Sequence, residues 1–63
     1  MNQERFIRLH EVIQMTGISK TTVYEYIRRG AFPKQYHLTT RISAWKLSEI
    51  TAWVDSRTNG GAA

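Results

Sequence analysis

The chain has 63 residues, of which 41 % are hydrophobic, so it forms at most one domain and buries only roughly 60 % of its unfolded surface. It has no cysteine, which excludes disulfides and thiolate metal centres, and it has neither an apolar run near the ~20 residues of a membrane helix nor the apolar core of a signal peptide. The net charge of +4 is concentrated in residues 19–46, where Glu25 is the only acidic residue. This concentration favours a polyanionic partner, with a solvated basic face as the alternative.

The first predicted element is a short helix over residues 9–15. Its apolar residues recur at helical spacing, at Ile7, Leu9, Val12 and Ile13. Gly17 follows, and glycine suits the positive φ that lets a chain reverse sharply after a helix. Ile18 is expected to fold back as an apolar plug.

A second helix is predicted to begin after Ser19 and to end before Gly30. The Ser19 hydroxyl suits an N-cap, and glycine is the usual residue just beyond a helix C-terminus. The apolar spacing assigns the buried face to Val23, Tyr26 and Ile27. Two short helices joined by a glycine turn are typical of the helix-turn-helix.

Two short strands and a third helix are predicted in the rest of the chain. Alternating apolar residues indicate strands over residues 35–39 and 41–44, with residues 39–41 at the turn. Ser48 is expected to cap the third helix, whose apolar stripe comprises Ile50, Trp53 and Val54. The aromatic residues predicted to lie in the core are Phe32, Tyr36, Trp45 and Trp53. The predicted fold is mainly α with a small β-hairpin, a winged helix-turn-helix over residues 1–57 followed by a flexible tail over residues 58–63.

Two stretches of the chain resemble the AlpA-type prophage regulators, which are small relatives of excisionases and of the MerR winged-helix superfamily. The stretches are RLHEVIQMTGISKTTVYEYIRRGAFPK and RISAWKLSEITAWV. The second carries an arginine four residues before a tryptophan, then a Ser-Glu pair and a second tryptophan. Together they cover roughly residues 8–57. The chain departs from the family at the wing tip, where Thr39 and Thr40 stand in place of frequent glycines.

The resemblance implies a sequence-specific, double-stranded DNA-binding transcriptional regulator of a prophage or mobile element, located in the bacterial cytoplasm at the nucleoid. The alternative is an excisionase that binds and bends attachment-site DNA. The implied partners are double-stranded DNA, further copies of the chain on adjacent sites, and phage integrase, either as a partner or as a regulated gene. No membrane, cofactor, metal or small-molecule ligand is expected.

The second helix is predicted to enter the major groove, which admits one helix, with its N-terminal half nearest the bases. Lys20 and Thr21 lie in its first turn, where backbone amides and the helix dipole attract phosphate. Thr22 and Glu25 are predicted to reach base edges, the glutamate accepting from a cytosine amino group. The alternative for Glu25 is an ion pair with an arginine one turn later. The predicted DNA contacts are Ser19, Lys20, Thr21, Thr22, Tyr24, Glu25, Arg28, Arg29, Lys34 and Arg41.

The other predicted contacts are mainly to the DNA backbone. Tyr24 contacts phosphate if it follows its counterpart in the family, or else covers the flank of the helix. Arg28 is a phosphate clamp, and Arg29 is either the same or a partner of the helix dipole. Arg41 is placed at the wing for minor-groove or backbone contact, with stacking on Trp45 as the alternative.

Two other classes of function are compatible with a chain of this size. An enzyme is disfavoured because His10 and His37 are isolated in the sequence, and no nucleophile–base set, carboxylate pair or phosphate-binding glycine loop accompanies them. The same two histidines with Glu11 supply too few ligands for a metal. A protein-interaction module remains compatible with the fold class, and salt dependence of binding separates it from a DNA-binding protein.

Overall fold

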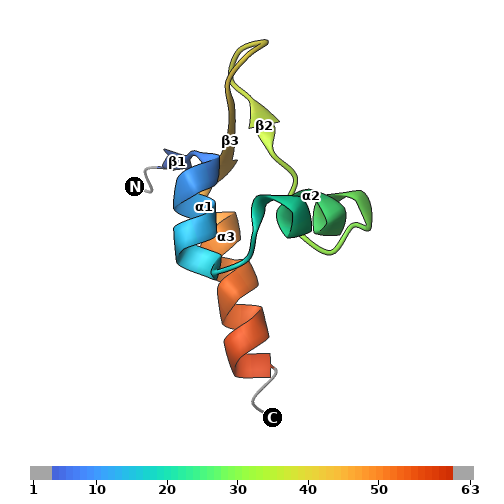
Figure 1. Ribbon diagram of the computed structural model, residues 1–63. Coiled ribbons are helices and arrows are strands. Elements are labelled where there is room, and N and C mark those ends of the chain that lie inside the picture. Colours follow the sequence, from blue (N-terminus) through green and yellow to red (C-terminus); the bar gives the residue numbers. More distant parts are fainter. Residues whose placement is uncertain (1–3, 61–63) are drawn as a thin grey trace.

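The computed structural model describes residues 4–60, with side chains described through residue 58, and shows three helices packed at one end of a small sheet (Figure 1). The elements in chain order are β1 Phe6–Ile7, α1 Leu9–Thr16, α2 Lys20–Arg28, β2 Tyr36–His37, β3 Ser43–Lys46, α3 Leu47–Asp55 and the π-helical turn η1 Ser56–Gly60. In Figure 1, α2 lies crosswise to α1 and α3, and the β2–β3 hairpin projects away from the helices. The predicted winged helix-turn-helix architecture is confirmed.

The turn between α1 and α2 is built from the local signals that the sequence carries. Gly17 adopts a φ of 77°, and its N–H donates to the Ile13 carbonyl at 2.7 Å, which closes α1. The Ser19 hydroxyl then caps α2 by accepting from the Thr22 N–H at 3.2 Å. Gly30 also adopts a φ of 77°, just beyond the end of α2. The start of α2 after Ser19 and its end before Gly30 are therefore as predicted, and α1 ends at Thr16, one residue beyond the predicted end.

The sheet contains one strand more than the predicted hairpin. β3 is central, in the order β1-β3-β2, and pairs antiparallel with both neighbours. Ile7 of β1 lies opposite Trp45, and Tyr36 of β2 lies opposite Ala44. The first predicted strand, over residues 35–39, shortens to the two residues of β2, and the second, over residues 41–44, shifts along the chain to Ser43–Lys46. The central position of β3 joins the N-terminal segment and the wing into a single sheet.

The core lies between the three helices and the base of the sheet. Its buried apolar residues are Ile7, Val12, Val23, Phe32, Ala44, Trp45 and Ile50. Trp45 is fully buried, and its indole N–H donates to the Pro33 carbonyl at 3.0 Å. The Trp53 indole N–H donates in the same way to the Ala31 carbonyl at 2.8 Å. The two tryptophans therefore hold the loop that follows α2 through their indole N–H groups.

Three sequence-based assignments to the core or to a helix cap are wrong in detail. Tyr36 is 37 % exposed rather than buried, because β2 is only two residues long and lies at the edge of the sheet. Trp53 is half-buried and packs against the core from outside. Ser48 does not cap α3, since β3 runs directly into that helix and Lys46 takes the N-cap position. The Ser48 hydroxyl instead donates to the Glu4 carboxylate at 3.0 Å.

The C-terminal part of α3 is tied to α2 through an arginine. The Arg57 guanidinium lies over the Trp53 ring at 4.8 Å and the Tyr26 ring at 5.6 Å. Residues 58–60 continue in η1, and residues 61–63 lie outside the described residues, so the predicted flexible tail stays a prediction. None of the helices in the described part of the chain is long and apolar enough to cross a membrane.

Candidate nucleic-acid interface

α2 turns one face into the core and the opposite face to solvent. Val23 is fully buried, and Tyr26 and Ile27 pack against the core cluster. Lys20 and Thr21 are exposed in the first turn, where the N–H groups have no partners within the helix. The solvent face of α2 is therefore polar and cationic at its N-terminus and is free for contact with an anion.

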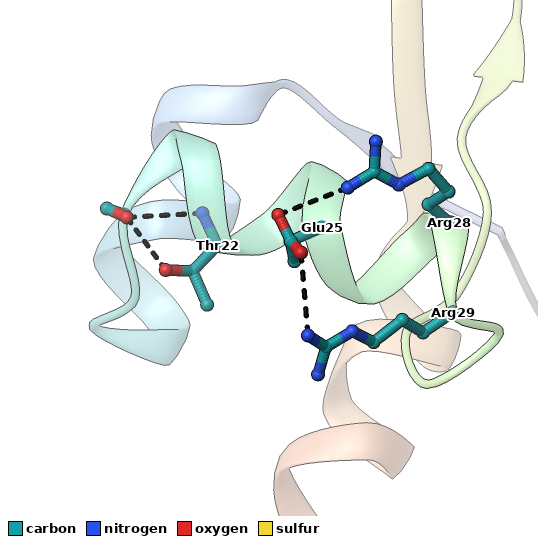
Figure 2. A network of polar contacts seen from close by, with 5 residues as sticks. Thr22, Glu25, Arg28 and Arg29 are labelled. Carbon is teal, nitrogen blue, oxygen red and sulfur yellow. Dashed lines mark hydrogen bonds and ion pairs between the residues drawn. The ribbon is translucent and has the colours of Figure 1, made fainter.

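The first turn of α2 is fixed by a pair of hydroxyl groups. The Ser19 hydroxyl donates to the Thr22 hydroxyl oxygen at 3.0 Å while it accepts from the Thr22 backbone N–H (Figure 2). Thr22 is half-buried, and in this arrangement its own hydroxyl proton remains available as a donor. The Ser19 hydroxyl is thus used in the helix cap, whereas the Thr22 hydroxyl can still donate a hydrogen bond to a ligand.

Glu25 binds both arginines that end α2. Its two carboxylate oxygens lie 3.3 Å from Arg28 Nη2 and 3.5 Å from Arg29 Nη2 (Figure 2). The ion-pair alternative for Glu25 is therefore confirmed. The arginine side chains are 75 % and 67 % exposed, and the glutamate is 40 % exposed. Ion pairs this exposed contribute only about 0.2–1 kcal/mol each, so either arginine can exchange its partner at small cost.

Tyr24 and Arg41 come together at the junction of α2 and the wing. The Tyr24 ring lies 6.4 Å from the Trp45 ring and is 37 % exposed, so it covers the flank of the core and still reaches solvent. Arg41 is exposed and lines the same hollow as Tyr24. The cation–π contacts found between residues 4 and 58 involve Arg57 and Lys46, and the stacking alternative for Arg41 is not among them.

A threonine organises the wing tip. The Thr39 hydroxyl oxygen accepts from the N–H groups of Arg41 at 3.1 Å and Ile42 at 3.0 Å. The Leu38 N–H donates to the Ile42 carbonyl at 2.8 Å and closes the hairpin. Thr40 is exposed at the tip. A side-chain-to-backbone turn of this kind holds the chain without a residue of positive φ, which explains how the tip forms without glycine.

Lys34 lies apart from the other predicted contacts. It lines a second hollow, between the loop after α2 and α3, together with Tyr36 and Glu49. The Tyr36 hydroxyl donates to the Glu49 carboxylate at 3.0 Å, and this bond raises the pKa of Tyr36 above its ordinary 10.0. Lys46 lies over the same ring at 5.1 Å and acts in the opposite direction. The structure therefore does not bring Lys34 to the hollow of Tyr24 and Arg41.

Sequence reasoning missed Arg8, which lines the hollow that Tyr24 and Arg41 share. The N-terminal segment has no net charge, because its two arginines are balanced by two glutamates, and so the charge pattern does not indicate a contact there. Arg8 is the N-cap residue of α1, and β1 places it beside the base of the wing. No local pattern signals this position, since the hollow is assembled from three separate segments.

The fold and the solvent face of α2 define a winged helix-turn-helix protein. The family of the prophage CP4-57 regulatory protein (AlpA) matches residues 5–58, and the chain belongs to that family, as the resemblance predicted. An uncharacterized protein, ORF88, of Enterobacteria phage P4 is 47 % identical over 60 residues, covering 95 % of this chain and 68 % of the relative. The DNA-binding transcriptional activator AlpA of Escherichia coli (strain K12) is 32 % identical over 59 residues, covering 84 % of each chain.

Proposed function

We propose that this protein binds double-stranded DNA sequence-specifically and regulates transcription of prophage or mobile-element genes, with α2 in the major groove and the β2–β3 hairpin as a wing. The observation that carries the proposal is the division of α2 into two faces. One face is anchored in the core through Val23, while the other presents Lys20, Arg28 and Arg29 to solvent. A helix held rigidly by one face and cationic on the other is suited to groove insertion.

Phosphate contacts account for most of the proposed affinity. Lys20 and Thr21 lie at the N-terminus of α2, where the dipole and the free amides favour phosphate. Arg28 and Arg29 exchange Glu25 for phosphate oxygens, because guanidinium binds phosphate through two parallel hydrogen bonds. These contacts position the protein on the duplex and carry no direct sequence information.

Sequence is read by the residues at the middle of α2. The release of both arginines frees the Glu25 carboxylate to accept from a cytosine amino group, and Thr22 offers a hydroxyl to a neighbouring base. Each good pairing contributes about 1–3 kcal/mol of discrimination against the wrong base. Arg41 is carried by the wing to the minor groove or the backbone beside it.

The regulatory role rests on the family. The Escherichia coli relative is described as a transcriptional activator, and we carry transcriptional regulation over to this chain. A DNA-bound regulator acts in the cytoplasm at the nucleoid. Further copies on adjacent sites fit the small interface of about 600–1,000 Å² that a single module offers. Phage integrase is the expected regulated gene or partner.

The test is DNA binding by the Arg28→Ala variant, measured by fluorescence anisotropy. The control is Arg5→Ala, which removes the same charge from the residue just before β1. Arg28→Ala should weaken binding to every duplex and make the log–log salt slope shallower by about 0.9, the value for one phosphate contact. Its Tm should stay that of the wild type, because the side chain is 75 % exposed. Equal losses in the two variants would contradict the proposal for α2.

The same protein preparations separate a regulator from an excisionase. A regulator binds the operator of the gene that it controls, whether or not the duplex bends there. An excisionase occupies several adjacent sites and bends the duplex, which a circular-permutation gel detects as position-dependent mobility. Strong bending on attachment-site DNA would replace the regulatory role while leaving the α2 interface in place.

A further inference from the structure

A hollow of about 410 Å³ lies between the start of α1, the middle of α2 and the base of the wing. We call it the notch. Polar side chains from all three segments line it: Arg8, His10, Tyr24, Arg41 and Ser43. Trp45, which is fully buried, forms its apolar floor and is fixed by the hydrogen bond to the Pro33 carbonyl. The notch is thus a preformed cavity on a rigid base and does not depend on a single element.

The charge in the notch is of one sign. Its lining contains two guanidinium groups, from Arg8 and Arg41, and no carboxylate. The ion pairs found between residues 4 and 58 both belong to Glu25 on α2, so neither arginine of the notch is neutralised by them. Glu11, which accepts from the Arg8 backbone N–H at 3.2 Å, lines a different hollow. Two cations that share a concave surface without a counter-charge attract an anion strongly.

We propose that the notch binds one phosphate group of the DNA backbone, at the point where the strand passes from α2 to the wing. This inference rests on the proposed function and adds a contact that the α2 face does not supply. Guanidinium groups bind phosphate oxygens bidentately, and two arginines from separate segments of the chain line the notch. The hydroxyls of Tyr24 and Ser43 and a ring N–H of His10 supply further donors.

The position of the notch supports a backbone contact in particular. Tyr24 belongs to the helix proposed to enter the major groove, Ser43 begins β3, and Arg41 lies in the wing turn just before that strand. A duplex that contacts both elements presents the phosphates between the two grooves to the surface that joins them. The notch adds a third point of attachment, besides the N-terminus of α2 and the tip of the wing. A contact at this point would fix the angle between the duplex and α2.

The test compares Arg8→Gln with Arg5→Gln, which removes the same charge three residues earlier, outside the notch. Anisotropy titrations over a range of salt concentrations are recorded with an upstream duplex of the protein's own gene and a scrambled duplex. Arg8→Gln should make the slope of log K against log salt shallower by about 0.9 on both duplexes, and Arg5→Gln should leave it near the wild-type value. Arg8→Lys keeps the charge but loses the fork, so it should retain the slope and lose several-fold in affinity. Thermal unfolding of all three variants checks the fold.

Two results overturn the inference while the proposed function stands. Both require that the wild type binds DNA. In one, Arg8→Gln and Arg5→Gln change the salt slope equally; in the other, neither variant changes it. If the wild type binds neither duplex at low salt, the proposed function fails, and a titration with inorganic phosphate followed by amide NMR judges the notch alone. Shifts confined to Tyr24, Ser43 and their neighbours would then support a phosphate site filled by free phosphate, and uniform or absent shifts would overturn it.

Discussion

In the proposed DNA complex, the balance between specific and unspecific binding depends on Glu25. In the free protein its carboxylate holds Arg28 and Arg29 at 3.3 and 3.5 Å, so part of the positive charge on α2 is compensated from within the helix. On a duplex with a suitably placed cytosine, the carboxylate gains a new donor while the arginines gain phosphates. On other sequences it faces the backbone without a donor and repels it. Under the proposed function, this single acidic residue would therefore disfavour the wrong DNA sequence as well as favour the right one.

This role predicts that Glu25→Gln raises affinity for a scrambled duplex more than for the native one. The gain should reach up to about tenfold, equal to about 1.4 kcal/mol, because one negative charge is removed beside the phosphates. Asp55→Asn, which removes an exposed negative charge on α3, is the matched control and should change neither affinity by as much. Anisotropy with both duplexes measures the four values. A parallel gain for native and scrambled DNA in Glu25→Gln would mean that Glu25 reads no base.

A second residue-scale prediction concerns the titration of Tyr36. Its hydroxyl donates to Glu49 at 3.0 Å, so the neutral form is favoured and the pKa lies above 10.0 in the folded protein. The hydrogen bond stabilises the fold below pH 10.0 and is lost as the pH rises through the raised pKa. Glu49→Gln should bring the pKa of Tyr36 back toward 10.0. The phenolate absorbance of each protein, after subtraction of the matching Tyr36→Phe variant, gives the titration curve, and coincident curves would contradict the hydrogen bond.

At the scale of elements, the two adjacent threonines of the wing tip have different roles. Thr39 accepts from two backbone N–H groups, whereas Thr40 is exposed at the tip. Thr39→Ala should therefore increase amide exchange at Arg41 and Ile42, with a loss of about 1 kcal/mol for the missing bonds. Thr40→Gly should leave exchange in β2 and β3 close to the wild-type rates. Equal effects of the two substitutions would show that the turn is not held by the Thr39 side chain.

The elements that the sequence predicts well are those with local signals. Gly17, Ser19 and Gly30 each mark a helix boundary through their own conformational or hydrogen-bonding preference, so α1 and α2 could be placed within a residue or two. β1 could not be foreseen, because it is two residues long and its partner is β3, near the other end of the chain. Residue type alone predicts Ser48 as the cap of α3, whereas β3 continues directly into α3 and the N-cap residue is Lys46.

In the candidate site, too, the features with local signals could be predicted and those assembled from distant segments could not. The contacts within α2, from Ser19 to Arg29, repeat every three or four residues and are visible in the sequence, including the ion pairs of Glu25. The notch is not visible in the sequence, because Arg8 and Arg41 are far apart along the chain and come to line one hollow through the fold, which pairs β1 with β3. Tyr36 shows the same limit, since alternation assigns it to one face of a strand but cannot say whether another element covers that face.

For the whole molecule, the two tryptophans explain how so short a chain presents a rigid surface. Trp45 and Trp53 donate to the carbonyls of Pro33 and Ala31, which fixes the path from α2 to the wing. Trp45 is also the floor against which Tyr24 packs. The distance between α2 and the wing is thus set by the core, so in the proposed complex both elements would engage one duplex without an ordering step. Preorganisation of this kind lowers the entropic cost of binding.

The measurement that tests the central claim most directly is a salt-dependent anisotropy titration of the wild-type protein against two labelled duplexes, one from the region upstream of its own gene and one scrambled. Four exposed cations, Lys20, Arg28, Arg29 and Arg41, predict a slope of log K against log salt of about −4 on both duplexes, since each phosphate contributes about −0.9. The account also predicts tighter binding to the native duplex at every salt concentration. Absence of binding to either duplex at low salt, or binding with almost no salt dependence, would contradict it and would favour a protein partner for this surface.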